Sequence, residues 1–420
     1  MVTPSVVAHW VRSGKVGLSV VTAALDADPR TTGADTTFAT SVDETARAID
    51  RAAAAGPVLA LYSAYSTDFD LLAADVAAIR ARTSAAALHV VGGVHATAEP
   101  AAALAARFDL AVVGEGEATA VALADVVARG GEPRDLPGVA HLDRGRLVTH
   151  GPGPRHPLDA FPPFNARHGK WNAIEITRGC VYACSFCQTP FAFKARFRHR
   201  SVEDVAAHVR TMRKGGARYV RFLSPTALSY GSEDESVQLD AVEALLAATR
   251  EALGEGGRIY FGTFPSELRP EHVTPEALAV LRRWVDNDVL VIGGQSGSQR
   301  VLDATRRGHD VASIERAVDA SLAAGFRPDV DFLLGLPGET REDREASIAL
   351  AERLVARGAR IHSHAFMPLP GTPLRGAAPS PIEDEVGLAM SRLESAGAMY
   401  GQWRKQVVTA ERLRASARRP

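Results

Sequence analysis

Short apolar runs alternate with amphipathic helical segments along most of the chain, and this alternation limits the possible folds more than any other feature of the sequence. A helix between two strands carries the chain back so that the next strand can pair in parallel, which gives βαβ units and parallel sheets. We therefore expect an α/β protein. With 420 residues, the chain is long enough for two or three domains of about 150 residues each.

The first 150 residues predict one Rossmann-like, doubly wound domain, and the proline- and glycine-rich stretch 151–170 predicts a linker after it. Doubly wound sheets bind ligands beyond the carboxyl ends of their strands, at the point where the strand order reverses. The predicted strands are Val16–Ala23, Val58–Ser63, Leu88–Gly92 and Leu110–Val113, and the predicted helices are Val42–Ala55, Phe69–Arg82, Ala101–Arg107 and Ala118–Arg129.

Residues 171–375 predict a second α/β domain, a partial (β/α)6 TIM-type barrel, followed by a C-terminal helical extension over 376–420. In barrels of parallel strands, the reactive groups lie at the carboxyl ends of the strands. The predicted strands are Ala173–Thr177, Tyr219–Leu223, Arg258–Gly262, Val289–Gly293, Asp329–Leu334 and Arg360–Phe366, with helices at Val202–Lys214, Ser236–Leu253, Pro275–Val285, Val311–Ala324 and Arg341–Arg357.

All three cysteines of the chain, Cys180, Cys184 and Cys187, lie within eight residues, directly after the first strand of the second domain. Thiolates this close can converge on one inorganic centre, and soft sulfur selects zinc or iron–sulfur chemistry. Structural zinc uses four protein ligands, whereas three thiolates would leave one iron of a [4Fe–4S] cluster open and reactive. A zinc site made of these thiolates and a distant histidine is the alternative.

Composition and charge exclude several other classes of protein. Lysine plus arginine (48) nearly equals aspartate plus glutamate (49), so the chain lacks the basic excess of a general nucleic-acid binder. No run of about 20 apolar residues predicts a membrane span, and the first residues do not resemble a secretory signal. Three cysteines are too few for a disulfide scaffold. We expect a cytoplasmic enzyme.

The Cys-x3-Cys-x2-Cys spacing, with Phe186 before the last cysteine, resembles the signature loop of the radical S-adenosylmethionine (SAM) superfamily. Three later segments support this resemblance: Gln295–Leu302 with Arg306–Gly308, Asp331–Thr340 and Pro368–Pro373. The resemblance implies a [4Fe–4S] cluster whose open iron chelates SAM, and electron transfer from the cluster then gives a 5′-deoxyadenosyl radical. It also implies a flavodoxin- or ferredoxin-type reductant as a partner.

Candidate SAM-binding residues follow from the resemblance and from polar side chains at the predicted strand ends. Ser266, Glu267 and Arg269 offer the mix of donors and acceptors that the ribose and carboxylate of SAM require, although capping residues have the same character. The full set of candidates is Phe186, Ser224, Ser266, Glu267, Arg269, Gln295, Ser296 and Gly335.

His362 and His364 alternate along the last predicted strand, so both side chains point to one face of the sheet. We expect them to hold substrate or to act as an acid–base pair, and a metal-binding pair is the alternative. No other catalytic residue can be assigned from the sequence.

Two glycine-rich strand ends in the first domain, upstream of such a core, resemble the N-terminal cobalamin (B12)-binding domain of B12-dependent radical SAM proteins. Such loops let backbone amides approach a large cofactor, although ordinary turns use the same residues. The Asp-x-His-x-x-Gly motif that supplies a cobalt-ligating histidine is absent. His95 is a candidate replacement, and a degenerate domain without cobalamin is an alternative. The candidate cobalamin-binding residues are Gly92, Gly93, His95, Gly114, Glu115 and Gly116.

The resemblance leads to a cobalamin-dependent radical SAM methyltransferase that acts on an unactivated carbon of an unknown small molecule or peptide. Methylthiotransferases carry a second cluster on three further cysteines, which this chain lacks. One alternative keeps the same cofactors for a rearrangement or cyclisation, and another uses SAM radical chemistry with a degenerate cobalamin domain. An iron–sulfur sensor or electron carrier is the non-enzyme alternative, disfavoured because a carrier would gain from a fourth cysteine.

Overall fold

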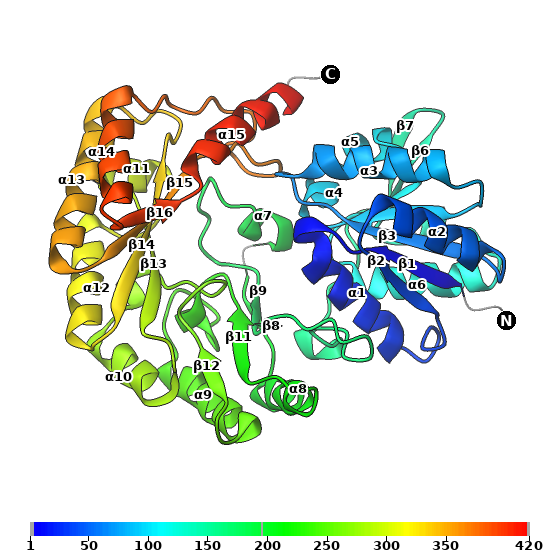
Figure 1. Cartoon of the computed structure of the whole chain (residues 1–420), viewed down its shortest axis with the longest axis horizontal. Coiled ribbons are helices and arrows are strands. Elements are labelled where there is room, and N and C mark those ends of the chain that lie inside the picture. Colours follow the sequence, from blue (N-terminus) through cyan, green and yellow to red (C-terminus); the bar gives the residue numbers. More distant parts are fainter. Residues whose placement is uncertain (1–3, 195, 418–420) are drawn as a thin grey trace. The chain divides into compact units, whose positions relative to one another are not determined.

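The computed structural model describes residues 4–194 and 196–417, and the chain forms two compact units. Unit 1 ends at Asn172 and unit 2 begins at Ala173, so the proline- and glycine-rich stretch 151–170 packs as part of unit 1. Both units combine parallel strands with helices (Figure 1). The chain is therefore a mixed α/β protein, and each unit is described separately below.

Unit 1 is a seven-stranded sheet in the order β2-β1-β3-β4-β5-β6-β7. The first five strands run parallel, whereas β6 and β7 form an antiparallel hairpin at one edge. The order 2-1-3-4-5 is a doubly wound topology that reverses direction between β1 and β3. The strands are β1 (Ser5–His9), β2 (Thr36–Ala39), β3 (Val58–Ser63), β4 (Leu88–Gly92), β5 (Leu110–Val112), β6 (Val139–Asp143) and β7 (Arg146–Thr149).

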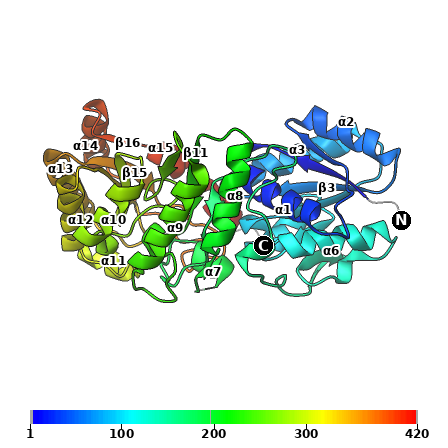
Figure 2. The ribbon, with the colours of Figure 1, turned by 90° about the horizontal axis from the view of Figure 1, so that it is seen from below.

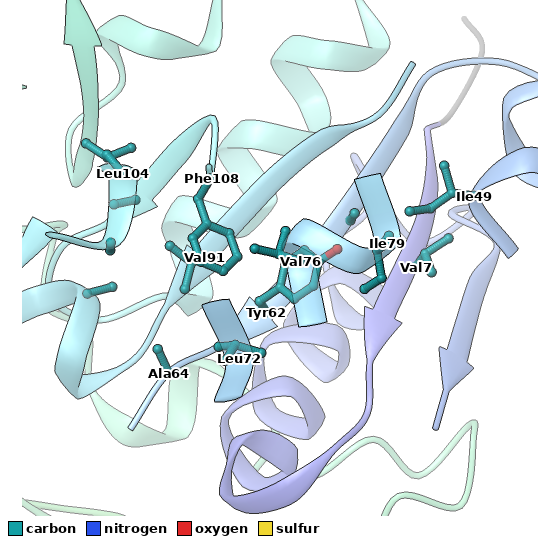
Figure 3. Packing of buried hydrophobic residues seen from close by; sticks show 14 of the residues in the cluster. Val7, Ile49, Tyr62, Ala64, Leu72, Val76, Ile79, Val91, Leu104 and Phe108 are labelled. Atoms are coloured by element: carbon teal, nitrogen blue, oxygen red, sulfur yellow. The ribbon is translucent and has the colours of Figure 1, made fainter. Parts of the chain in front are cut away.

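Successive side chains of the parallel strands point alternately into two separate apolar cores, one on each face of the sheet. Tyr62 and Val91 belong to the core that packs against α2 (Val42–Ala53) and α3 (Phe69–Arg82), seen in Figure 3. Their neighbours along the strands, such as Leu61, belong to the opposite core. Helices α1 (Lys15–Ala27) and α6 (Glu117–Ala128) cover that face, and the short helices α4 (Val94–Ala98) and α5 (Pro100–Ala105) follow β4.

The predicted strand Val16–Ala23 is wrong, because these residues form most of helix α1. Its valines and threonine favour a strand locally, but Leu18, Thr22 and Leu25 recur at helical spacing and are buried. Packing of that face against the sheet and α6 overrides the local preference. The sequence did not predict strands β1 and β2; β1 pairs with β3, and β2 pairs with β1 at the edge of the sheet.

Unit 2 contains seven parallel strands in two sheets, β12-β11-β8 and β13-β14-β15-β16. A parallel bridge between Leu268 and Ile292 joins the segment after β12 to β13, so the strands form one continuous arc. The strands are β8 (Ile174–Glu175), β11 (Tyr219–Leu223), β12 (Arg258–Tyr260), β13 (Val289–Gln295), β14 (Arg327–Leu334), β15 (Arg360–Ala365) and β16 (Met399–Gly401).

Helices lie between successive strands of unit 2, and α8 and α9 run side by side (Figure 2). Ser201 caps α8 and Thr340 caps α13, each accepting a hydrogen bond from a backbone amide of the first turn. The main helices are α8 (Val202–Lys214), α9 (Leu239–Leu253), α10 (Pro275–Trp284), α11 (Gln299–Ala304), α12 (Val311–Ala323), α13 (Arg341–Arg357), α14 (Asp384–Ser395) and α15 (Trp403–Ala417).

The predicted C-terminal extension contains a strand as well as helices. β16 lies between α14 and α15 and pairs in parallel with β15. Only three residues long, it carries too short an apolar pattern to be recognised from sequence. Residues 418–420 of the predicted extension lie outside the described residues. In the part of the chain that is described, none of the helices has both the length and the apolar character needed to span a bilayer.

Replacing Ile79 by alanine should destabilise unit 1, because this side chain is fully buried between α3 and the sheet. We expect the free energy of unfolding to fall by about 2–5 kcal/mol. Leu71→Ala on the same helix is the matched control, since Leu71 is 49% exposed and its truncation should cost less than about 0.5 kcal/mol. Scanning calorimetry of the full chain measures both, and equal shifts would contradict this packing.

Candidate functional site

The three cysteines lie together in a loop that follows β8 and the short strand β9 (Thr177–Arg178). Cys180 and Cys184 are buried, and Cys187 is half-buried. Gly179, immediately before the loop, has a φ of +84°, and a Cβ there would lie 2.0 Å from the carbonyl oxygen of Arg196. Only glycine fits this position, because the backbone of the next segment passes where a side chain would begin.

Two of the thiols, those of Cys180 and Cys187, lie in an environment that opposes their ionisation. Burial raises the pKa of Cys180 to about 12, and the neighbouring Cys187 and Cys184 sulfurs raise it further. Burial also raises the pKa of Cys187. Thiolates are the metal-ligating form of cysteine, and a bound cation lowers the pKa of the thiols that it binds. The Cys180 and Cys187 thiols, whose pKa values burial raises, therefore fit a site in which a bound centre supplies positive charge, such as an iron–sulfur cluster.

Hydrogen bonds tie the cysteine loop to segments that follow three other strands of unit 2. The backbone amide of Ser185 donates to the Thr305 carbonyl at 3.0 Å. The side-chain amide of Gln188 donates to the Pro370 carbonyl at 2.8 Å. Tyr182 hydrogen-bonds with His272, with 2.9 Å between Oη and Nε2. The loop thus lies across the carboxyl-end segments after β12, β13 and β15, the edge where chemistry is placed in barrels of parallel strands.

Arg307 is a site residue to which the sequence gave no role, although it belongs to one of the recognised segments. Its Nη1 donates to the Cys184 sulfur at 3.5 Å, and its Nη2 donates to the Gly293 carbonyl at 2.7 Å. Hydrogen bonds to cysteine sulfur help to set the reduction potential of iron–sulfur clusters. Arg307 therefore places a positive charge beside the sulfur of Cys184.

Arg269, a candidate SAM contact, packs against Tyr182 of the cysteine loop. Its guanidinium lies 3.5 Å from the centre of the Tyr182 ring, a cation–π distance. The same group donates to Glu271 at 2.5 Å and to the Arg307 carbonyl. Arg269 is only 3% exposed, so these contacts occupy its side chain. A contact with SAM remains a prediction for this residue.

The remaining SAM candidates lie at strand ends, and several are engaged in turns. The Ser224 hydroxyl donates to the Thr226 carbonyl, and the Ser266 hydroxyl donates to the Thr263 carbonyl. The Ser296 hydroxyl hydrogen-bonds with the Ser347 hydroxyl and accepts from the Ser298 backbone amide. All three serines are buried. Phe186 packs against the cysteines and against a second apolar cluster that contains Val301, Leu336 and Phe366. Gln295 has a φ of +74° where β13 ends in an irregularity, and such strain in a non-glycine residue often marks a functional position.

Gly335 and Glu339 form a second tight turn, after β14. The backbone amide of Gly335 donates to Oε2 of Glu339 at 2.6 Å. Among the described residues, Oε1 of Glu339 has no hydrogen-bond partner although it is buried. Burial raises the pKa of Glu339 to about 7; Arg344, 3.8 Å away, does not offset this because its closer ion pair is with Glu383. A carboxyl that is half protonated near neutral pH thus lies at this strand end.

His362 and His364 form one polar cluster with Asp331, which the sequence did not single out as a site residue. His362 lies opposite Asp331 in the β14–β15 register, 2.8 Å from its carboxylate. Burial favours the protonated carboxyl of Asp331, but the contacts with His362 and His364 outweigh it and lower the pKa. Burial and the Asp331 charge raise the pKa of the nearby Glu267 to about 7. The sequence signal for Asp331 was its position on the strand next to the histidines.

In unit 1, the glycine-rich strand ends pack closely against the protein itself. A Cβ on Gly93, whose φ is +94°, would lie 2.7 Å from the Ala64 carbonyl oxygen, and one on Gly114 would lie 3.2 Å from the Gly153 nitrogen. Glu115 and Gly116 lie in the loop between β5 and α6, and Gly92 is the last residue of β4. Close packing is therefore one physical reason for Gly93 and Gly114, and cofactor contact by these loops remains a prediction.

The His95 side chain is buried in unit 1. Its ring stacks on Phe69 with 3.9 Å between ring centres, its Nδ1 contacts the Ser66 hydroxyl at 3.2 Å, and its Nε2 is buried. Burial lowers the pKa of His95 to about 4, so the ring is neutral. In this conformation His95 packs in the core of unit 1, and reaching a cobalt ion would require the ring to move.

The strand order reveals a ligand edge that the sequence missed, because β1 was not predicted. The reversal between β1 and β3 places the crevice for a ligand beyond His9 and Ser63. There, a Cβ on Gly14 would lie 2.5 Å from the Ser63 carbonyl oxygen, so the start of α1 approaches β3 closely. Tyr65, in the loop that follows β3, is 37% exposed.

Residues 174–351 match the family model described as the Radical SAM superfamily. A tRNA-2-methylthio-N(6)-dimethylallyladenosine synthase from Hydrogenovibrio crunogenus is 30% identical over 234 residues, which cover 54% of this chain and 46% of that protein. The corresponding enzyme from Halorhodospira halophila is 32% identical over 208 residues, 48% of this chain and 41% of that protein. These matches therefore span about half the length of each relative.

Two solved structures resemble the fold across both units. The radical SAM methyltransferase TsrM from Kitasatospora setae, with cobalamin and a [4Fe-4S] cluster bound, has a TM-score of 0.69 at 18% identity, covering 89% of this chain and 74% of TsrM. The cobalamin-dependent radical SAM enzyme OxsB, with aqua-cobalamin bound, has a TM-score of 0.67 at 16% identity, covering 94% of this chain and 56% of OxsB. At such identities the likeness establishes the shared fold.

Replacing Gly179 by alanine should remove most of the iron from the purified protein, because the new Cβ would collide with the Arg196 carbonyl and displace Cys180. Gly216→Ala is the matched control. Gly216 has a similar φ of +90°, but its Cβ would meet no other heavy atom within 4 Å, so it should cost only about 1–2 kcal/mol of backbone strain and leave iron content unchanged. Equal iron content in both variants would contradict this structure of the loop.

Glu339 should make the protein less stable as pH rises from about 4.5 to about 7. The folded state holds the proton up to pH 7, whereas the unfolded chain releases it near its ordinary pKa of 4.5. The loss amounts to about 3 kcal/mol as an order of magnitude. Glu339→Gln keeps an acceptor for the Gly335 amide and should make the fall of the melting temperature with pH less steep, leaving the part that Glu267 contributes.

The exposed Glu342 provides the control for this measurement. Its pKa is lowered by hydrogen bonds to its own backbone amide and to Thr340, so Glu342→Gln should retain the wild-type loss of stability between pH 4.5 and 7. A Glu339→Gln profile parallel to that of the wild type would show that Glu339 is ionised in the folded protein.

Proposed function

Because this chain carries a radical SAM domain in a fold shared with cobalamin-dependent radical SAM enzymes, we propose that it is a cobalamin-dependent radical SAM methyltransferase. The methyl acceptor is an unactivated carbon of an unidentified small molecule or peptide. One observation carries the proposal: a three-cysteine loop at the strand ends of unit 2 follows a doubly wound unit 1 in a single chain.

Cys180, Cys184 and Cys187 are the residues that would hold the cluster. When bound, the cluster supplies the electron that cleaves SAM, and cobalamin supplies a carrier for the methyl group. The protein contributes position and charge: Arg307 donates to the Cys184 sulfur, and Arg269 and His272 hold Tyr182 in place. Gln188 fixes the other end of the loop on Pro370. These contacts keep the sulfur ligands in position while substrates enter and leave.

The carboxyl edge of the sheet in unit 1 is the surface to which we assign cobalamin. Ligands of doubly wound sheets bind where the strand order reverses, which here is the edge beyond β1 and β3. His95 is buried in this conformation, so the proposal does not require a histidine ligand to cobalt. The candidate residues Gly93 and Gly114 lie at the ends of the next two strands along the same edge.

The relatives that match by sequence are named as tRNA-2-methylthio-N(6)-dimethylallyladenosine synthases or, in one case, as a putative methylthiotransferase, and the match covers about half of their length. Sulfur insertion by such enzymes needs a second cluster on further cysteines, and this sequence contains no cysteine outside the one loop. The fold likeness to TsrM and OxsB, which includes unit 1, favours cobalamin chemistry instead. We propose a flavodoxin- or ferredoxin-type protein as the electron donor.

A cobalamin titration of the full chain tests the proposal. We expect about one cobalamin per chain, and Tyr65→Glu should weaken binding at least about tenfold, or 1.4 kcal/mol, because a charged side chain would replace an aromatic ring at the assigned edge. The control is Leu147→Glu on the β6–β7 hairpin, since Leu147 is 41% exposed and Tyr65 is 37% exposed.

Equilibrium dialysis with hydroxocobalamin measures these affinities. Failure of the wild-type chain to bind would rule out cobalamin-dependent transfer and leave a radical SAM enzyme with a degenerate unit 1. Equal weakening by both variants would place cobalamin elsewhere. Incubation with reductant and methyl-labelled SAM then separates methyl transfer from rearrangement, because only the former moves the label into a product.

A further inference from the structure

We propose that Asp331, His362 and His364 form a second metal site in unit 2, a tetrahedral site for a divalent ion such as Zn²⁺ with one position open to a ligand. The site consists of residues of β14 and β15 and shares no residue with the cysteine loop. It does not depend on cobalamin binding or on methyl transfer, and its test is independent of both.

The three side chains lie on one face of the sheet. Along β15, Ile361, Ser363 and Ala365 are buried, whereas His362 and His364 between them are half-buried. Along β14, Val330 and Phe332 belong to the same apolar core as Ile361. Because side chains alternate across a strand, Asp331, His362 and His364 point away from that core. Their side chains are 13%, 27% and 30% exposed, so solvent and ions can reach them.

The distances between the polar atoms match those between the ligands of a small cation. Asp331 Oδ1 lies 2.8 Å from His362 Nδ1 and 3.8 Å from His364 Nε2, and the two ring nitrogens are 3.2 Å apart. The mean, about 3.3 Å, is the spacing of tetrahedral ligands around an ion with bonds of about 2.0–2.1 Å. A point just outside the plane of the three atoms is at that distance from all of them.

Gln406 of α15 ties His364 to the backbone of β15. Its Oε1 accepts from the Ala365 backbone amide at 2.8 Å, and its Nε2 lies 3.2 Å from His364 Nδ1. Because Nδ1 of His364 faces Gln406, the other ring nitrogen, Nε2, faces His362 and Asp331. One nitrogen from each ring and one carboxylate oxygen therefore meet at the same place.

Neighbouring groups hold the ligands in place, as metal sites require. The His362 ring stacks on Tyr400, with 4.5 Å between ring centres and 10° between planes, and Tyr400 donates to Asp329 at 3.0 Å. The contact between Gln406 Nε2 and His364 Nδ1 at 3.2 Å keeps the His364 ring oriented with Nε2 towards the other two ligand atoms. Gln406 is therefore a positioning residue for the site.

Two histidines and one carboxylate suit a borderline ion such as Zn²⁺. Three protein ligands leave one tetrahedral position free, which is the arrangement of catalytic rather than structural zinc sites. The ligand of that position is an oxygen donor, either water or an anionic oxygen of a bound molecule. Glu267 interacts electrostatically with Asp331 and His362, and Arg307 interacts in turn with Glu267.

Zinc binding to the full chain tests the site. The protein is made without cobalamin, its cluster is reconstituted without oxygen, and free metal is removed with a chelator before Zn²⁺ is titrated. Iron is measured on the same samples, so that zinc entering the cysteine loop would be seen as lost iron. We expect about one zinc per chain, with iron unchanged and with a rise in melting temperature as the bound ion stabilises the fold.

His364→Ala and the nearly isosteric Asp331→Asn should each weaken zinc binding at least about a hundredfold and abolish the zinc-dependent rise in melting temperature, with iron unchanged. His208→Ala is the matched control, because His208 also contacts a carboxylate, that of Asp204 at 3.3 Å, in a pair outside this cluster, and it should leave zinc binding unchanged. No zinc on the wild-type chain, zinc gained only as iron is lost, or equal binding by all variants would overturn the proposal and leave a hydrogen-bonded cluster.

Discussion

Parallel strand pairing is the constraint on which the rest of this structure depends. Because parallel strands point the same way, their carboxyl ends meet at one edge, and residues that are far apart in sequence become neighbours there. In unit 2 this brings the cysteine loop after β8 into contact with the segments that follow β12, β13 and β15. In unit 1 it places the loops after β1 and β3 at one ligand edge.

Charge at these edges is arranged around buried groups that cannot ionise freely. Cys180 and Cys184 are buried, Cys187 is half-buried, and Arg307 places a guanidinium against the Cys184 sulfur. Glu339 is buried with its nearest arginine engaged elsewhere. A bound cofactor or ion changes the balance at such positions, so binding and protonation are coupled in unit 2.

The sequence predicted those parts of the structure that local patterns determine. Long amphipathic segments such as Phe69–Arg82 and Arg341–Arg357 were located to the residue, because periodicity and caps mark them. Val16–Ala23 was misassigned because its helical character comes from packing against other elements. The reversal at β1 and the pairing of Asp331 with His362 depend on strand order and register, which no single segment encodes. Arg307 was visible in the sequence, but its contact with Cys184 exists only in the fold.

The central claim is that Cys180, Cys184 and Cys187 hold an iron–sulfur cluster with one iron open to SAM. Electron paramagnetic resonance of the anaerobically reduced protein, recorded with and without SAM, tests it most directly. We predict the signal of a reduced [4Fe–4S] cluster whose g-values shift when SAM is added, since SAM would bind the iron that lacks a cysteine. A cluster signal unchanged by SAM, or a loop filled by zinc without any such signal, would contradict this account.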